Sequence, residues 1–332
     1  MTLTYEDGKK LSSLGLWLGV FVLCCLWTAI QPQAANAQIS RVKRVDGAST
    51  SVGKFTYLYN VSVDQAGNVY VADTGNHRIV KLDPTGNPIA VFGKQGTGPG
   101  EFMWPMAVVV DRKGNMYVAD NVNHRVQKLS SEGSFIWQVG GDVVASSNGA
   151  TEQPLIDSPF GLALDSEGSL YVADAMLHRI VKLNPDGNLI TRWGEFGTEP
   201  GQMRYPHSVA VDKAGNVYVS DFVNHRIQKF TSDGKFLAAW GGPGTAEGQF
   251  QDPWGVAVDN KNRVWVADLS NHRIQVFNKK GKLQFSFGSF STDPDESDQF
   301  NYPKGIAFGP GGAIWIAHTG VSAVDLYRLD SK

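Results

Sequence analysis

The chain has 332 residues, of which 42% are hydrophobic and 19% are charged, and its formal net charge is −2. This composition excludes an intrinsically disordered chain, because enough apolar side chains are present to form a core. The balanced charge argues against a nucleic-acid partner, because such surfaces need clustered Lys and Arg to displace counterions.

The N-terminal residues 1–37 have the pattern of an export signal. Two lysines precede an apolar run over residues 11–30, and Ala35-Asn36-Ala37 follows. A basic flank, an apolar run and a small-x-small site predict a signal peptide that is cleaved before Gln38. The run is also long enough to span a bilayer, so an uncleaved anchor is the alternative, and membrane association is expected only in that case. Both interpretations make residues 38–332 extracytoplasmic, in the periplasm or secreted.

A repeated motif organises the rest of the chain. Gly67 to Ile79 reads GNVYVADTGNHRI, and six copies begin at 67, 114, 168, 215, 262 and 312, in steps of 47, 54, 47, 47 and 50 residues. Apolar residues alternate within each copy, which predicts β-strands, and Gly, Asn and Asp occupy the turns between them. A four-stranded antiparallel unit repeated in this way predicts an all-β fold, a six-bladed β-propeller over residues 38–332.

The ends of the repeat region predict how the ring closes. In the first repeat, strands a, b, c and d are expected at residues 61–64, 69–73, 79–83 and 88–93. The last repeat supplies only strands a, b and c before the sequence stops. Residues 39–47 lie upstream of the first repeat and have the register of a strand d. We therefore expect this N-terminal strand to complete blade six and to bury Val42 and Val45.

Gly-rich links join each strand d to the next strand a. Each link ends at a proline, at 105, 159, 206, 253 and 303, and Leu58 takes this place in the first repeat. Two links are longer, over residues 142–157 and 291–299. The second carries four acids between Asp293 and Asp298, which makes calcium a candidate ligand, although spaced acids on a loop are more commonly just solvated.

The triplet Asn-His-Arg recurs beside Tyr-Val-Ala-Asp at residues 76–78, 123–125, 224–226 and 271–273. The third copy has Leu177 in place of Asn, and the sixth keeps none of the triplet. These repeats resemble the NHL-repeat family over roughly residues 39–332. The resemblance implies a six-bladed propeller but no single function, because the family includes RNA- and protein-binding modules, receptor sensor domains and peptidyl-amidoglycolate lyases.

An Asp at the end of strand b and a His four residues later recur in five copies. Metal binding or acid–base chemistry is one hypothesis for such pairs. An element present in every repeat more commonly serves the repeat, so we expect His or Arg to hydrogen-bond back to the Asp within each blade. The pairs are Asp73/His77, Asp120/His124, Asp174/His178, Asp221/His225 and Asp268/His272.

Binding residues are better sought where the repeats differ. The residue after each proline should lie near the central channel, on the face formed by the d–a and b–c loops, and aromatic groups there are typical of binding surfaces. The alternative is a core wedge between blades, for Trp104 and Tyr205 above all. The residues after the proline are Tyr59, Met106, Phe160, His207, Trp254 and Lys304, and those before it are Tyr57, Trp104, Ser158, Tyr205, Asp252 and Tyr302.

These positions favour a non-catalytic binding or scaffold propeller that recognises a protein, peptide or glycan on its loop face. The alternative is a metal-dependent lyase or hydrolase similar to the amidoglycolate lyases or lactonases. The resemblance to those lyases implies a zinc held by three histidines in the channel, and Pro206-His207-Ser208 resembles one ligand position. His207 and His318 do not make a three-histidine site, so no cofactor and no catalytic residue is predicted, and zinc at His207 stays an open alternative.

Overall fold

The computed structural model describes four stretches of the chain, residues 39–48, 50–141, 154–290 and 299–329. The predicted export signal, the acidic insert from Asp293 to Asp298 and most of the link 142–157 lie outside these stretches. Within them, no helix is both long enough and apolar enough to cross a membrane.

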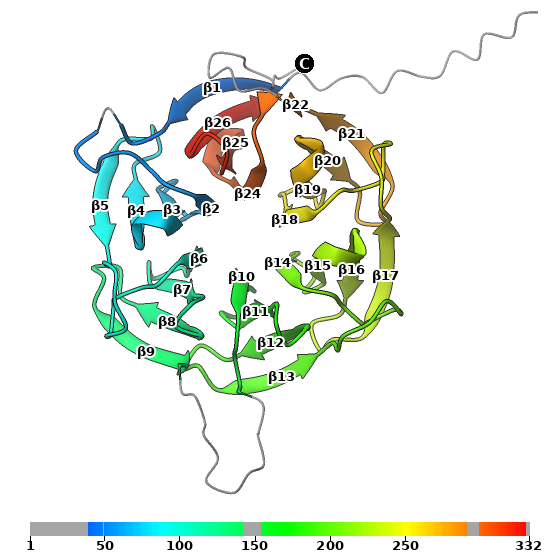
Figure 1. The fold of residues 1–332 in the computed structure, drawn as a ribbon, viewed down its shortest axis with the longest axis horizontal. Helices are drawn as coiled ribbons and strands as arrows, with labels where there is room; N and C mark the ends of the chain where they lie inside the picture. The colour runs from blue at the N-terminus through cyan, green and yellow to red at the C-terminus, as the bar shows by residue number, and fades with distance from the viewer. Residues whose placement is uncertain (1–38, 49, 142–153, 291–298, 330–332) are drawn as a thin grey trace, which may run out of the picture. The chain divides into compact units, whose positions relative to one another are not determined.

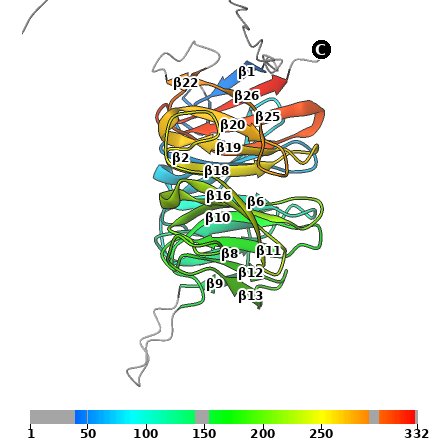
Figure 2. The same cartoon turned by 90° about the vertical axis from the view of Figure 1, so that its right-hand side faces the viewer.

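Six four-stranded antiparallel sheets surround a central axis, as predicted (Figure 1). Five of them take their strands in chain order, with strand a next to the axis, and Figure 2 shows the ring edge-on. The blades are β2 (Leu58–Val63), β3 (Val69–Asp73), β4 (Arg78–Leu82) and β5 (Pro88–Phe92); β6 (Pro105–Val110), β7 (Met116–Asp120), β8 (Arg125–Leu129) and β9 (Phe135–Gly140); β10 (Pro159–Leu164), β11 (Leu170–Asp174), β12 (Arg179–Leu183) and β13 (Leu189–Trp193); β14 (Pro206–Val211), β15 (Val217–Asp221), β16 (Arg226–Phe230) and β17 (Phe236–Gly241); and β18 (Pro253–Val258), β19 (Val264–Asp268), β20 (Arg273–Phe277) and β21 (Leu283–Phe287).

The sixth blade joins the two ends of the described chain, which confirms the predicted closure. It consists of β24 (Pro303–Phe308), β25 (Ala313–His318), β26 (Ala323–Leu329) and the N-terminal β1 (Ile39–Val45) as its outer strand. β1 pairs with β26 antiparallel. The arginine Arg44 of β1 donates two hydrogen bonds, of 2.9 and 2.8 Å, to the buried carboxylate of Asp325 on β26. A charge-assisted pair therefore adds to the backbone bonds that close the ring.

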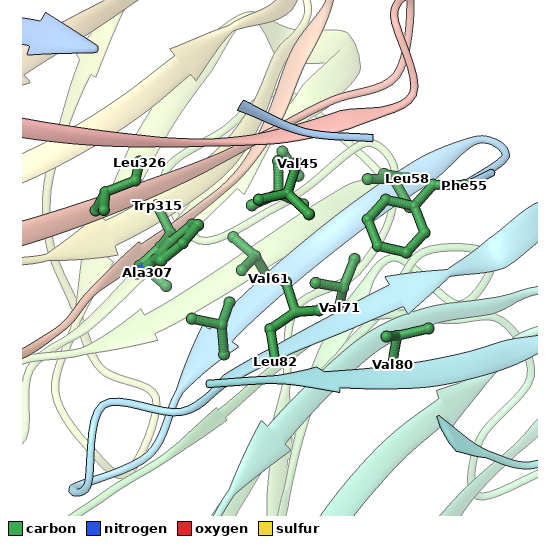
Figure 3. Packing of buried hydrophobic residues seen from close by; sticks show 13 residues of the cluster. Val45, Phe55, Leu58, Val61, Val71, Val80, Leu82, Ala307, Trp315 and Leu326 are labelled. Atoms are coloured by element: carbon green, nitrogen blue, oxygen red, sulfur yellow. The ribbon is translucent and has the colours of Figure 1, made fainter. Parts of the chain in front are cut away.

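The burial predicted for this strand was half right. Val45 is buried and packs with Trp315 and Leu326 in the core between blades six and one (Figure 3). Val42, in contrast, is 55% exposed. The pairing register of β1 shifts between Arg41 and Lys43, and this irregularity leaves Val42 out of the alternation that would have buried it.

Each strand a begins about three residues earlier than predicted, at the proline or at Leu58. Pro105, for example, pairs with Asp120 at the end of strand b, and the register shifts directly after it. A proline is tolerated as the first residue of a strand because no ladder hydrogen bond is then lost. The proline thus fixes where each inner strand starts, on one face of the ring.

The wedges between blades come from strand b and not from the loops. One fully buried aromatic ring stands in strand b of each blade, namely Tyr70, Tyr117, Tyr171, Tyr218, Trp265 and Trp315. Trp104 and Tyr205 are 37% and 36% exposed, so the wedge alternative for them was wrong. Both have positive φ, at 56° and 55°, which takes them out of the strand alternation before the proline.

Candidate functional site

The repeated Asp organises the turn after strand b within its own blade. The carboxylate of Asp73 is fully buried and accepts hydrogen bonds from Arg78 Nε at 2.7 Å, from the Asn76 amide and from the Thr56 N–H at 2.8 Å. Equivalent Arg–Asp pairs at 2.7 to 2.8 Å recur in blades two, four and five. The predicted bond back to Asp is therefore made by Arg and Asn, and the His of the triplet does not contribute to it.

The third blade shows what the departure from the triplet changes. Leu177 cannot donate to Asp174, and the ion-pair distance between Arg179 Nε and Asp174 is 3.6 Å. The Asp174 carboxylate accepts two backbone N–H groups, that of Ser158 at 2.9 Å and that of Asp157 at 3.2 Å, where the Asp of the first blade accepts one. Burial raises the pKa of Asp174, and the remaining hydrogen bonds oppose that rise. This Asp is structural, as in the other blades.

Each triplet His contacts the next blade. The ring atom Nδ1 of His77 accepts the backbone N–H of Trp104, at 3.1 Å, and the same bond joins His178 to Tyr205 at 3.2 Å. The donor is in each case the residue before the proline. The fourth and fifth histidines repeat the bond: His225 Nδ1 accepts the N–H of Asp252 at 3.2 Å, and His272 Nδ1 accepts that of Tyr302 at 3.3 Å.

The bond expected from His or Arg back to the Asp is made by Arg, and the histidines have another role, as His225 shows. Asp221, its expected partner, accepts instead from the side chains of Asn224 and Arg226. His225 ends the short 3-10 turn after strand b with a left-handed backbone, at φ 53°, and its Nδ1 atom lies 3.7 Å from the carboxylate of Asp252 on the link into blade five. The same correction applies to His77, His124, His178, His225 and His272: they link neighbouring blades.

Two interfaces make this link with different atoms. His124 Nδ1 lies 2.6 Å from the carbonyl oxygen of Asp157 and 2.9 Å from its carboxylate, so this ring nitrogen donates. In the sixth copy, Ser322 occupies the His position, and its hydroxyl accepts the N–H of Tyr57 at 3.3 Å. The five histidines and Ser322 all have positive φ, between 49° and 56°. The divergent sixth copy therefore keeps the link after losing the motif.

The six residues after the proline all line one small cavity on the channel. Its volume is about 20 Å³, so the structure brings Tyr59, Met106, Phe160, His207, Trp254 and Lys304 together. We call these six residues the channel ring. Met106, His207 and Lys304 are each buried, and the space left between the side chains of the ring is small. Its role in binding stays a prediction.

His207 lies at the centre of an aromatic cluster. Its imidazole stacks on Phe160 at 4.5 Å and on Phe222 of the b–c turn at 3.9 Å, and Trp254 lies 4.2 Å away, all measured between ring centroids. Burial, with a smaller effect of the Lys304 charge, lowers the pKa of His207 to about 3, so the ring is neutral at pH 7. Its Nδ1 atom has no hydrogen-bond partner among the described residues.

Lys304 is the one formally charged member of the channel ring. Its Nζ atom lies 3.4 Å from the ring centroid of Tyr59 and 4.0 Å from that of Trp254. Burial lowers the pKa of Lys304 to about 7, whereas the two π faces favour the charged ammonium. In the described part of the chain, no carboxylate forms an ion pair with it.

The position after each channel-ring residue is small, which sequence reasoning overlooked. A Cβ on Gly255 would lie 1.8 Å from the carbonyl oxygen of Lys304, so only glycine fits there. Where the residue is polar, it bonds to the next blade: Ser208 Oγ accepts the N–H of Val256 at 3.2 Å. Small residues at this register let the inner strands approach closely. The signal in the sequence is the series Asn60, Ala107, Gly161, Ser208, Gly255 and Gly305.

Aromatic side chains stand exposed around the mouth of the channel. They belong to the residues that precede the proline of each inner strand. The inner strand has the same place in every blade, so all inner strands start on the same face of the ring. Tyr57 and Trp104 stack on each other at 6.2 Å. We call the four exposed members Tyr57, Trp104, Tyr205 and Tyr302 the rim aromatics.

The residues available for a metal do not fit the zinc alternative. Among the described residues, no three His, Cys, Asp or Glu side chains gather as a ligand group. His318, the second candidate, is buried in blade six, 3.4 Å from Asp325 and stacked on Phe300. His207 is surrounded by aromatic rings, so neither histidine has the companions that a three-histidine site requires.

A larger cavity, of about 440 Å³, lies away from the channel ring. It is lined by the a–b turns of blades two and three, which include Asp111 and Asp165, and by Lys128 of β8. In an antiparallel blade the a–b turns lie on the face opposite the d–a loops. Sequence reasoning did not single out this cavity, and its polar turn residues carry no repeat-breaking signal.

Comparison with known families identifies the repeat. The sequence model of the NHL repeat matches residues 60–82, 102–129, 203–230 and 250–277, in blades one, two, four and five. The third and sixth copies, which depart from the triplet, are the two without a match. A search among curated proteins finds no match.

Solved structures share the fold at low sequence identity. A streptogramin B lyase aligns with a TM-score of 0.60 and 17% identity, over 83% of this chain and 94% of its own. A gluconolactonase from Xanthomonas campestris aligns at 0.62 and 15%, over 89% and 96%. A protein of unknown function from Bacteroides thetaiotaomicron aligns at 0.64 and 19%, over 88% and 76%. Identities this low show a common fold and nothing about chemistry.

Proposed function

We propose that this chain, an NHL-repeat β-propeller of six blades, is an exported, non-catalytic protein that binds a protein or peptide segment on its loop face. The contact surface consists of the rim aromatics with the channel ring at its centre. Propeller structures of this kind include lyases and lactonases, so the site residues, and not the fold, have to support the choice.

The observation that carries the proposal is the exposure of the rim aromatics. Each of these residues has a positive φ, which a bulky side chain rarely adopts, and each is 36–52% exposed. Solvent-exposed aromatic groups concentrated on one face are typical of binding surfaces, where Trp and Tyr act as anchors. The inter-blade bonds at the same residues hold the backbone in place, so the surface is preorganised.

A peptide fits this face better than a glycan does. Beside the rim aromatics, the b–c turns expose Val122 and Met176, which are apolar and offer no hydrogen bonds to sugar hydroxyls. Met adapts its shape to varied apolar partners, as promiscuous peptide-binding surfaces do. The metal-enzyme alternative finds no supporting ligand set in the described residues.

Selection from a phage-displayed library of random peptides tests the proposal. The wild-type propeller should enrich a family of peptides, and the double variant Trp104→Ser/Tyr302→Ser should lose them. The matched control is Ile89→Ser/Ile190→Ser. It changes two exposed apolar residues on the outer strands β5 and β13, away from the proposed contact surface, and should retain the peptides. Equal enrichment by both double variants would refute the assignment of this face.

A further inference from the structure

The channel ring contains a buried lysine that has no acidic partner among the described residues. Lys304 is 6% exposed, and the cavity in front of it is lined by no Asp or Glu. Its neighbours are the rings of Tyr59 and Trp254; burial raises the pKa of the Tyr59 phenol and lowers that of His207, so neither ring is charged at pH 7. A buried ammonium without a carboxylate is rare in proteins and is typical of functional sites.

The two aromatic faces stabilise the ammonium only in part. A cation over a π face gains electrostatic attraction, but the ammonium also has three N–H donors, and the faces of Tyr59 and Trp254 offer these donors no oxygen or nitrogen acceptor. Desolvation leaves these donors ready for an acceptor that carries negative charge, because charge-assisted hydrogen bonds are the strongest available to them. Burial alone lets the ammonium and the neutral amine of Lys304 coexist near pH 7, and an anion bound beside Nζ would favour the charged form.

From these contacts we propose that Lys304 anchors a carboxylate of the bound peptide, either an acidic side chain or the C-terminal group. This assignment rests on the proposed binding function. The cavity of about 20 Å³ has room for little more than one water molecule, so nothing bulkier than a carboxylate oxygen can lie in front of the ammonium there. A phosphate group is a poorer match, because phosphate sites combine several donors from Arg or backbone N–H groups, and the cavity lining contains no Arg.

The rim explains how the carboxylate reaches the ammonium. The rim aromatics surround the mouth and contact the apolar neighbours of the acidic residue, while their exclusion of water strengthens the ion pair at the centre. The ligand class that follows is a short peptide segment with one acidic group flanked by apolar or aromatic residues.

The experiment uses the peptides enriched by the wild-type propeller, with affinities measured by fluorescence anisotropy. The enriched sequences should share an acidic residue or a free C-terminus. Replacing the acidic residue by its amide in the synthetic peptide, or the C-terminal carboxylate by a carboxamide, should weaken binding at least 10-fold. Lys304→Met should weaken it equally, because Met keeps the stem without the charge, whereas Lys304→Arg should retain part of the affinity.

The control protein is Lys54→Met, which removes an exposed lysine from the link to the first inner strand and should leave affinity unchanged. The amide-substituted peptides test the pairing with unaltered protein, so a poorly folded Lys304 variant does not block the test. Enriched peptides that lack an acid, or that bind Lys304→Met unchanged, overturn the carboxylate anchor and leave the binding face intact. No enrichment at all overturns both, as does binding of an acidic oligosaccharide in place of peptides.

Discussion

The bonds between blades predict that removing one triplet histidine destabilises the ring. In His178→Ala, the backbone N–H of Tyr205 loses its acceptor, which lies 3.2 Å away in the wild-type protein. The imidazole also packs edge-on against Tyr205, at 4.8 Å, and tilted against Phe196, at 5.0 Å. Alanine must in addition adopt the φ of 53° that His178 has, a conformation in which His is enriched and Ala is not.

These losses sum to a measurable effect. The hydrogen bond contributes about 1 kcal/mol to the free energy of unfolding. The two ring contacts contribute roughly 0.5 kcal/mol or more each, and the left-handed conformation costs alanine about 1 kcal/mol. We therefore expect His178→Ala to lower the unfolding free energy by about 3 kcal/mol, which corresponds to a melting temperature roughly 5 °C lower, since the entropy of unfolding is about 2.1 cal/mol/K per residue.

Two further variants separate the causes. His178→Gly removes the same side chain but tolerates positive φ, so it should be less destabilising than alanine. Asn262→Ala should cost only the backbone term, because Asn262 also has positive φ, at 57°, but makes no bond to another blade. Calorimetry or circular dichroism on heating gives the values. If His178→Ala melts with the wild type, or loses no more stability than Asn262→Ala does, the histidine does not link the blades.

Three other predictions follow from the same geometry. Burial lowers the pKa of His178 and His272, so the unfolded chain takes up the proton first and denaturant midpoints should fall as the pH drops below about 6.5; a flat profile between pH 7.5 and 5.5 contradicts this. Deleting residues 39–45 removes the outer strand and the arginine partners of Asp325, and should sharply lower the melting temperature; an unchanged value refutes the closure. Metal analysis should find no stoichiometric zinc, and peptide binding should survive a chelator; zinc bound at His207 would overturn the non-enzymatic proposal.

The sequence alone was sufficient for the architecture. Period-two alternation, turn residues at fixed offsets and a repeat near 47 residues predict four-stranded blades, six copies and closure by the N-terminal strand. The sequence also separated constant from variable positions. Six of the variable positions, the residues of the channel ring, line one cavity. These features depend on local patterning, which is written into each repeat and needs no knowledge of distant contacts.

The tertiary structure decided which atoms meet across blades. His77 bonds to Trp104, 27 residues further along, and Ser322 replaces a histidine in the sixth copy without any sequence similarity to mark it. The convergence of six inner strands at the axis likewise decides how much space the channel ring leaves. It also decides which side chains surround Lys304. A repeat specifies its own hydrogen bonds and strand register, but the contacts between repeats arise only when the curvature of the closed ring places them side by side.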